Sequence, residues 1–493
     1  MLTGFELHNC KAFSESGKMP LSPLTVLVGK NSAGKSSLLH ALMVLSQSVA
    51  DRAYSAKVPQ LNLKGRLIDA GTFKEFIHGH DEQSEIGFSF SFRFDSLTPT
   101  RPRFFKPLAD IDIPRVPDVQ FMYPFFRQPR RAKRTQNIAT PREIEVTMYF
   151  APEPPFGPAL SSLSISCTKL GKVDFKRTSG KERIQHWRCY ASDLPRRAFK
   201  LISPGFSFFP ILEVNQDVYK EVAPVIKKRI NDFSQCSVLA FTELLAFLAN
   251  LRMIGPFRTP PQRRFSFSGV GSLEVGLSGE NAVNLLITER LVRPKSTTIT
   301  NAVSFWLNHL GLAKRLKVRD IAKGTNVFEL LFSGAGAEVK ANFADVGFGV
   351  SQVLPVLVQG LLTPRKGTYI VQQPELHLHP DAQAGIADYF LYLASQEVNV
   401  IIETHSEYLL VRLRRRLAEK YRVPAIGLEK KPFRRKSVDQ SQVSVVLLRE
   451  AEGRSYLEEI NIGPSFQFEN MPSGFMNQSI EDRMALMKAL RRK

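Results

Sequence analysis

The spacing of apolar residues changes along this chain, and it first changes near the start, from a strand-like run to helical spacing. Residues 24–28, Leu-Thr-Val-Leu-Val, are apolar except for one threonine, which is typical of a strand buried on both faces. From residue 35 to 49 the apolar residues Leu38, Leu42 and Leu45 recur at helical spacing. The pattern therefore predicts a strand, a short turn and an amphipathic helix, in that order.

Similar patterns predict further elements. Alternating apolar and polar residues predict strands at residues 2–9, 86–94 and 144–150. Helical spacing predicts one helix over residues 219–251, which a following Gly-Pro pair stops, and another over residues 301–312.

The second half of the chain has a mixed pattern. Strand-like and helix-like runs alternate from residue 326 to 402, which predicts βα units in a parallel sheet. Within this part, residues 367–371 and 398–402 are short apolar runs that predict two of its strands.

The turn after the first apolar strand has the spacing of a complete phosphate-binding loop, Gly-Lys-Asn-Ser-Ala-Gly-Lys-Ser. Its glycines let backbone N–H groups surround phosphate oxygens, and the helix N-terminus adds a favourable dipole. Lys35 is expected to reach the β- and γ-phosphates of ATP, and the hydroxyl of Ser36 to bind Mg²⁺. The predicted nucleotide-binding residues of the loop are Gly29, Asn31, Ser32, Ala33, Gly34, Lys35, Ser36 and Ser37.

Two later strand ends carry polar residues that could meet this loop. Gln372 and Gln373 follow one predicted strand, and Glu-Thr-His-Ser at residues 403–406 follows the next. Ligands of open parallel sheets bind beyond the carboxyl ends of the strands, so we expect both ends to face the nucleotide. Upstream, residues 345–352 form a Gly-containing turn that opens a helix and can offer N–H groups and a Ser hydroxyl to another anion.

Together these motifs resemble the ABC-type ATPase heads related to SMC and Rad50 and to the OLD-like family. The resemblance is carried by Gly-Phe-Gly-Val-Ser-Gln at residues 347–352 and Pro-Glu-Leu-His-Leu-His-Pro at residues 374–380. It covers residues 1–80 and about 250–480. The middle of the chain is not covered.

The resemblance implies a homodimer or a higher oligomer, because in this family two heads enclose two ATP molecules. Gly347, Gly349 and Ser351 would then contact ATP held by a partner subunit. His405 would be the switch histidine that senses the γ-phosphate.

The sequence departs from the family at the catalytic strand end. Relatives usually have a carboxylate for Mg²⁺ at the position of Gln372, and Glu or Gln for the attacking water at the position of Gln373. The implied catalytic residues are thus Lys35, Gln372, Gln373 and His405, and the implied metal ligands are Ser36 and Gln372. A Gln cannot accept a proton as a carboxylate does, although its carbonyl can touch a metal or orient water. We therefore expect weak or absent hydrolysis, from either an engineered Glu-to-Gln change or natural use as a nucleotide-controlled clamp.

The expected fold is α/β: an ABC-ATPase head with a P-loop parallel sheet, plus an inserted β-rich and helical region. A chain of 493 residues exceeds the size at which single cores stop growing, so several lobes are expected. The expected parts are a first ATPase lobe, a β-rich insertion, a helical region returning to the head, a second ATPase lobe and a tail. Their boundaries are residues 1–80, 81–212, 213–320, 321–462 and 463–493.

Composition favours a cytoplasmic protein. No apolar run reaches the roughly 18 residues of a membrane span, and the first residues lack the basic segment of an export signal. The four cysteines are scattered, without the spacing of a zinc site or the density of a disulfide framework.

Two segments carry most of the formal net charge of +21. Arg101 to Arg134 holds nine basic and three acidic residues, and Arg412 to Lys436 holds eleven basic and two acidic residues. Such segments can bind nucleic acid, steer an acidic partner, or form a solvated surface.

The leading hypothesis is an ATP-driven switch that joins two heads. Stand-alone ATPases that resemble this chain act with a separate effector, such as a nuclease, in antiphage systems such as PARIS and Septu. After His405 the only aspartates are Asp439 and Asp482, which argues against a Toprim nuclease in that segment. The alternatives are a nucleotide-loaded scaffold without turnover and a DNA-binding repair ATPase, the latter disfavoured because no long heptad arm exists.

Overall fold

The structure is a computed structural model of the whole chain. It describes residues 1–50, 59–96, 137–153, 157–178, 186–195, 197–202, 211–267, 269, 274–293, 297–322, 325–334, 340–421, 437–451 and 453–470.

The fold is α/β, as predicted, and is built around a six-stranded sheet with the order β12-β17-β18-β4-β19-β20. All neighbours in this sheet run parallel except the edge pair β19 and β20. The strands predicted from mostly apolar runs, β4, β17 and β18, are neighbours in the middle of this sheet. The bounds are β12 (Leu251–Ile254), β17 (Thr368–Gln372), β18 (Asn399–Glu403), β4 (Leu24–Gly29), β19 (Val443–Ala451) and β20 (Arg454–Ile460).

The parallel sheet separates two hydrophobic cores. Leu27 and Ile401 belong to the core that includes α1, whereas Val26 and Ile402 belong to the core that includes α7 and α8. Successive side chains of a strand point to opposite faces, so strands covered on both sides read as continuous apolar runs. The covering helices are α1 (Lys35–Ala50), α7 (Phe348–Leu362) and α8 (Pro380–Ser395).

A second, antiparallel sheet has the order β2-β1-β5-β6-β7-β8-β9, with β3 paired to β1. Strands were predicted at β1, β5 and β6, and all three are present. Because β1 pairs with β5, a domain boundary at residue 80 divides this sheet between the first lobe and the β-rich part. The bounds are β1 (Leu2–Cys10), β2 (Phe13–Glu15), β3 (Met19–Pro20), β5 (Ile86–Ser96), β6 (Asn137–Ala151), β7 (Ala159–Cys167), β8 (Gly171–Thr178) and β9 (His186–Ser192).

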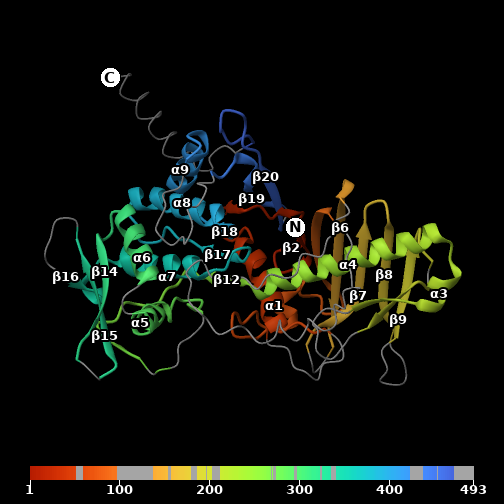
Figure 1. Ribbon diagram of the computed structural model, residues 1–493, viewed down its shortest axis with the longest axis horizontal. Helices are drawn as coiled ribbons and strands as arrows, with labels where there is room; N and C mark the ends of the chain where they lie inside the picture. The colour runs from red at the N-terminus through yellow and green to blue at the C-terminus, as the bar shows by residue number, and fades with distance from the viewer. Residues whose placement is uncertain are drawn as a thin grey trace.

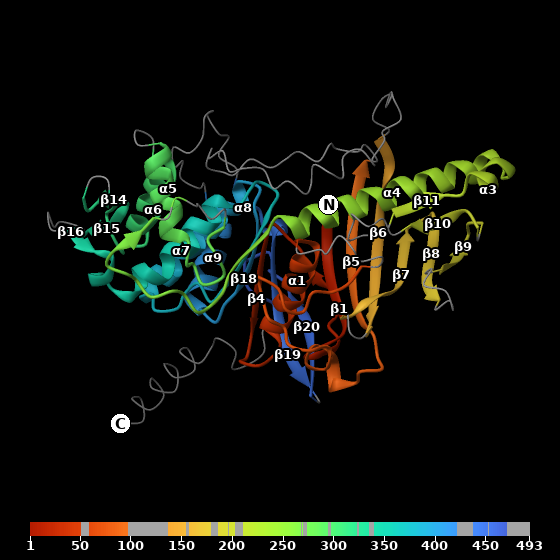
Figure 2. The ribbon, with the colours of Figure 1, turned by 90° about the horizontal axis from the view of Figure 1, so that it is seen from below.

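The helix predicted over residues 219–251 is two helices, α3 (Gln216–Glu221) and α4 (Pro224–Ala249). Pro224 starts α4 at a position where proline is tolerated, and Leu251 already belongs to β12. By length and composition α4 could cross a membrane, but one of its faces is buried. Figures 1 and 2 show α4 running across the strands of the antiparallel sheet, as expected of a core helix.

The prediction of parallel βα units from residue 326 was wrong for β15 and β16, which belong to a small antiparallel sheet. A short connection joins β14 to β15, and only antiparallel strands can be joined so directly. The helix predicted at residues 301–312 is α6, which begins and ends three residues earlier. The remaining bounds are α2 (Phe73–Phe76), α5 (Ala282–Val292), α6 (Thr298–His309), α9 (Glu407–Ala418), β10 (Phe199–Ile202), β11 (Ile211–Val214), β13 (Phe265–Ser266), β14 (Arg315–Asp320), β15 (Val327–Ser333) and β16 (Lys340–Asn342).

Candidate functional site

The carboxyl ends of three neighbouring parallel strands, β17, β18 and β4, lie side by side in the six-stranded sheet. Gln372 at the end of β17 lies in register with Glu403 at the end of β18, and Glu403 lies in register with Leu27 of β4. The phosphate-binding loop follows β4 directly and leads into α1. The structure therefore brings the loop and both strand ends together.

The loop has a backbone that requires glycine at two positions. Gly29 and Gly34 have φ angles of 152° and 91°. A Cβ atom would lie 2.6 Å from the carbonyl oxygen of Leu448 at Gly29, and 2.9 Å from the ring of Phe13 at Gly34. A larger residue at either position would displace Leu448 or Phe13, so glycine is needed for the loop to pack against these neighbours in this conformation.

Lys35 is almost completely buried inside this loop, with 4 % of its surface exposed. Its ammonium donates hydrogen bonds to the carbonyl oxygens of Gly29 at 3.0 Å and Lys30 at 2.6 Å. Burial lowers the pKa of Lys35, and the negative charge of Glu403 partly opposes that shift. The loop thus holds a cation on its own carbonyl groups, available to an anionic ligand.

A chain of hydrogen bonds links the loop to the two strand ends. The Ser36 hydroxyl donates to Glu403 Oε1 at 3.0 Å, and Gln372 Nε2 donates to Glu403 Oε2 at 2.5 Å. The two predicted metal ligands, Ser36 and Gln372, therefore both contact the carboxylate of Glu403, which was not among the predicted site residues. A signal was present, because Glu403 is the acidic residue that directly follows the apolar run of β18.

Gln373 holds a constrained position after β17. Its φ angle is 44°, a left-handed value unusual for a residue with a side chain, and its N–H donates to the Glu403 carbonyl oxygen at 2.7 Å. The buried guanidinium of Arg258 donates to the carbonyl oxygens of Gln373 at 3.1 Å and Gln372 at 2.7 Å. Arg258 therefore fixes the backbone that carries both amides.

The imidazole of His405 is exposed beyond the end of β18, and its backbone is anchored. Glu375 is buried, and its Oε1 accepts the His405 backbone N–H at 2.7 Å. Partial burial and the nearby charge of Lys35 lower the pKa of His405, so the imidazole is neutral at pH 7. Burial raises the pKa of Glu375, which acts here as a positioning residue for His405.

The Gly-containing turn opens α7, as predicted, with Gly347 as its N-cap. Gly347 and Phe348 are exposed, whereas Ser351 is 1 % exposed and its hydroxyl donates to the Phe348 carbonyl oxygen at 2.8 Å. A Cβ on Gly349 would lie 3.2 Å from the carbonyl oxygen of His377, so the turn packs on the loop that follows β17. In this arrangement the outer surface of the turn is made of Gly347 and Phe348, and the Ser351 hydroxyl faces inward.

The second basic segment uses several of its arginines inside the protein. Arg412 and Arg416 of α9 bind Asp388, Arg414 donates to the Phe466 carbonyl oxygen, and Arg415 pairs with Glu419. Each of these arginines thus has a partner within the chain, which weakens the case for α9 as a nucleic-acid surface. The segment from Arg101 to Arg134 and residues 422–436 lie outside the described residues.

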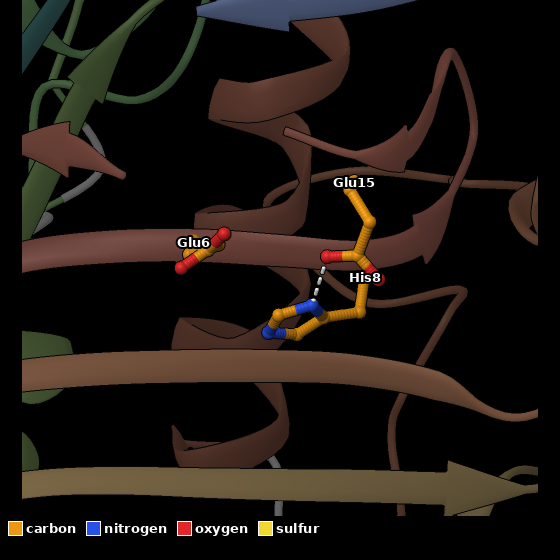
Figure 3. A group of neighbouring side chains, drawn as sticks. All are labelled: Glu6, His8 and Glu15. Atoms are coloured by element: carbon orange, nitrogen blue, oxygen red, sulfur yellow. Dashed lines mark hydrogen bonds and ion pairs between the residues drawn. The ribbon is translucent and has the colours of Figure 1, made fainter. Parts of the chain in front are cut away.

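A separate polar cluster lies on the antiparallel sheet, where Glu6 and His8 of β1 meet Glu15 of β2. The ring of His8 bonds to Glu15 through Nδ1 and to the Ser89 hydroxyl of β5 through Nε2, at 2.7 Å in the latter case. Figure 3 shows the ring directed at Glu15 with Glu6 beside it. Both ring nitrogens are engaged in tying β2, β1 and β5 together.

Comparison with known families gives one match. Residues 229–412 match the family model described as "AAA domain, putative AbiEii toxin, Type IV TA system". The matched part contains β17, β18 and the turn at Gly347, and it does not reach the phosphate-binding loop. It supports an ATPase of the AAA type at this coarse level. No curated protein matches the chain.

Solved structures of Smc heads align along most of the chain at low similarity. The Smc head bound to the C-terminal winged-helix domain of ScpA is 12 % identical with a TM-score of 0.40, covering 94 % of this chain and 98 % of that chain. The Smc head with an extended coiled coil from Pyrococcus furiosus is 11 % identical with a TM-score of 0.37, covering 99 % of both chains. The SMC head domain from Thermotoga maritima is 9 % identical with a TM-score of 0.35, covering 94 % and 99 %.

Proposed function

We propose that this protein binds a nucleoside triphosphate, with ATP as the expected ligand, and hydrolyses it slowly. The observation that carries the proposal is a chain of hydrogen bonds: Ser36, in the phosphate-binding loop, donates to Glu403 at the end of β18, and Glu403 also accepts from Gln372 at the end of β17. A phosphate-binding loop alone is a local motif. Here it lies beside two polar strand ends, so bound phosphates would have the loop on one side and polar side chains on the other.

The residues of the site have separable roles in this proposal. The loop N–H groups and Lys35 bind the phosphates, and the neutral imidazole of His405 contacts the γ-phosphate as a hydrogen-bond donor. Gln373 orients the attacking water through its amide but cannot take the proton. Positioning without a general base accounts for slow turnover.

The donors at this strand edge fit Mg²⁺. The Ser36 hydroxyl and the Glu403 carboxylate offer oxygen atoms, which are the ligands that this hard cation prefers, and the Gln372 amide hydrogen-bonds to that carboxylate. When bound, Mg²⁺ neutralises charge on the β- and γ-phosphates.

At a finer level we propose a cytoplasmic switch whose heads associate around bound nucleotide and control a separate effector, such as a nuclease, in antiviral defence. The motifs at residues 347–352 and 374–380 support this proposal through their family resemblance. The matching family is described as a putative toxin of a toxin–antitoxin system, which agrees with a defence role. Contact of Ser351 with a partner's nucleotide requires the inward-facing hydroxyl to be released from Phe348.

A scaffold that holds nucleotide without turnover is the second candidate. Gln372 and Gln373 favour it, because neither amide can act as a base. The two functions differ in phosphate release and share nucleotide binding.

The test measures binding of a fluorescent ATP analogue and steady phosphate release in the same preparations. Lys35→Ala is expected to abolish both, because the buried ammonium is lost from the phosphate cradle. Lys314→Ala removes an exposed lysine that directly precedes β14 and serves as the matched control. Binding that is unaffected by Lys35→Ala would contradict the proposal, and binding without any phosphate release would favour the scaffold.

The pH dependence tests the role of His405. Its lowered pKa means that the neutral imidazole is lost only as pH falls below 6.5. The kcat/KM for phosphate release, which reports groups of the nucleotide-free protein, should therefore be level near pH 7 and decline on the acid side, and His405→Gln should remove that decline. An acid limb that persists unchanged in His405→Gln assigns it to another group.

A further inference from the structure

We propose that Glu403, on β18, is the carboxylate that binds the divalent cation accompanying the nucleotide, in place of the strand end of β17. The inference rests on the proposed nucleotide binding at the phosphate-binding loop. It assigns the metal site to a strand that the family resemblance does not use for this purpose.

Position is the first argument. β18 lies between β17 and β4, so the end of β18 is closer than the end of β17 to the loop that follows β4. Glu403 Oε1 already accepts the Ser36 hydroxyl at 3.0 Å. A cation bound to the Ser36 hydroxyl therefore meets Glu403 first, and reaches Gln372 only beyond it.

Charge is the second argument. Glu403 is 3 % exposed, and both of its side-chain donors, Ser36 and Gln372, are neutral. The nearby positive groups are Lys35 and the N-terminus of α1, and a bound triphosphate engages both of them. Once phosphate fills the loop, a buried carboxylate and an anion lie close together. A divalent cation between them removes the repulsion.

The amide of Gln372 is the third argument. It donates its N–H to Glu403 Oε2 at 2.5 Å, so it orients the carboxylate. Ligating carboxylates are commonly held by such hydrogen bonds. A glutamate at position 372 would place two negative charges at this distance, whereas the amide lets one carboxylate serve the cation alone.

Neighbouring carboxylates do not meet the same conditions. Glu375 uses Oε1 to accept the backbone N–H of His405, and among the described residues no hydrogen bond joins Glu375 to Ser36 of the loop. The cluster of Glu6, His8 and Glu15 lies on the antiparallel sheet, and its His8 ring is bonded at both nitrogens (Figure 3).

The test measures Mn²⁺ as a probe for the cation, by the loss of its free electron paramagnetic resonance signal, in the presence of a non-hydrolysable ATP analogue. Glu403→Gln is expected to weaken Mn²⁺ binding by about tenfold or more, because one charged ligand is lost. The double variant Glu403→Gln with Gln372→Glu should recover part of the affinity, since it returns a carboxylate to the adjacent strand end. Glu289→Gln, which removes a buried carboxylate that caps α6, is the matched control and should leave Mn²⁺ affinity unchanged.

Binding of the analogue in EDTA provides a readout with the opposite sign. Without metal, Glu403→Gln should bind the nucleotide more tightly than the unmodified protein, because the buried negative charge beside the phosphates is gone. A merely structural role for Glu403 predicts equal or weaker binding in EDTA.

The outcomes separate the two proposals. If the analogue binds in a Lys35-dependent manner but Glu403→Gln keeps its Mn²⁺ affinity within about twofold, this inference is overturned and the nucleotide function stands. If no nucleotide binds at all, the proposed function fails and the inference falls with it.

A measurement on the unmodified chain covers the case in which Glu403→Gln does not fold. In this experiment Fe²⁺ is added in place of Mg²⁺, and ascorbate and peroxide then generate radicals at the bound iron that cleave the nearby backbone. Cleavage at Ser36 and Glu403 is the expected result. Cleavage confined to Glu375, or to residues 6–15, overturns the assignment.

Discussion

Two buried carboxylates, Asp388 of α8 and Glu403 of β18, are surrounded in opposite ways. Asp388 is fully buried and accepts hydrogen bonds from His309, Arg412 and Arg416. Burial alone would raise the pKa of Asp388, but hydrogen bonds from His309, Arg416 and Arg412 outweigh it and hold the pKa well below its usual range. Glu403 is buried almost as deeply, and the side chains that donate to it among the described residues, Ser36 and Gln372, are neutral.

The difference distinguishes a carboxylate that stabilises the fold from one that serves a ligand. Asp388 joins α6, α8 and α9 with cations supplied by the chain itself. Glu403 lacks such bonded cations at the sheet edge where the phosphate-binding loop begins. A buried charge is tolerated when it is paired, so Glu403 points to a cation from outside the chain.

The largest change in the free energy of unfolding is expected for Asp388→Asn. The change keeps the shape of the side chain but removes the buried anion that Arg412 and Arg416 share, and only Arg416 keeps a second carboxylate among the described residues, Glu419. Breaking such a buried pair costs about 3 to 5 kcal/mol. The urea midpoint of the circular dichroism transition should fall accordingly. An unchanged midpoint would mean that Asp388 does not stabilise the junction of α8 and α9.

The next effect concerns the ligand. Mg²⁺ and a non-hydrolysable ATP analogue, at about 100 times the dissociation constant, should stabilise the unmodified protein by about 2.7 kcal/mol. Glu403→Gln should lose most of this gain, because its cation site is gone. Thermal unfolding with and without ligand measures both values. A full ligand-induced shift in Glu403→Gln would remove the distinction between the two carboxylates.

Local sequence patterns predicted the central strands and the loop well. β4, β17 and β18 are mostly apolar on both faces because both faces of each strand are covered, and the glycines of the loop are required within a single turn. The helix predicted after the loop begins at Lys35, as in the structure.

Pairing between distant segments could not be predicted in the same way. Periodicity does not reveal that β1 pairs with β5, or that β15 runs antiparallel to β14. Glu403 was missed for a different reason: its strand end was expected to face the nucleotide, but the family resemblance assigned the metal role to the strand end of β17, and the hydrogen bond from Ser36 to Glu403 is seen only in the structure.

A smaller loss in the free energy of unfolding is expected when Asp388 loses one of its positively charged partners. Arg416→Met removes one of three donors but keeps an apolar side chain of similar length, so His309 and Arg412 remain. The loss of charged hydrogen bonds should cost about 1.5 to 3 kcal/mol, less than Asp388→Asn. Urea unfolding of both variants checks the order, and a larger loss in Arg416→Met than in Asp388→Asn would contradict it.

The smallest effect is expected for Glu403→Gln in the absence of nucleotide and metal. Glu403 contributes hydrogen bonds to Ser36 and Gln372, and a glutamine can keep part of them through its carbonyl oxygen. Removing the charge also removes the cost of burying it, and the two terms oppose each other. The free energy of unfolding should therefore change by less than about 1 kcal/mol in either direction. Urea unfolding in EDTA measures this value. A loss as large as that of Asp388→Asn would show that the chain itself already compensates the charge of Glu403, and the two carboxylates would then belong to one structural class.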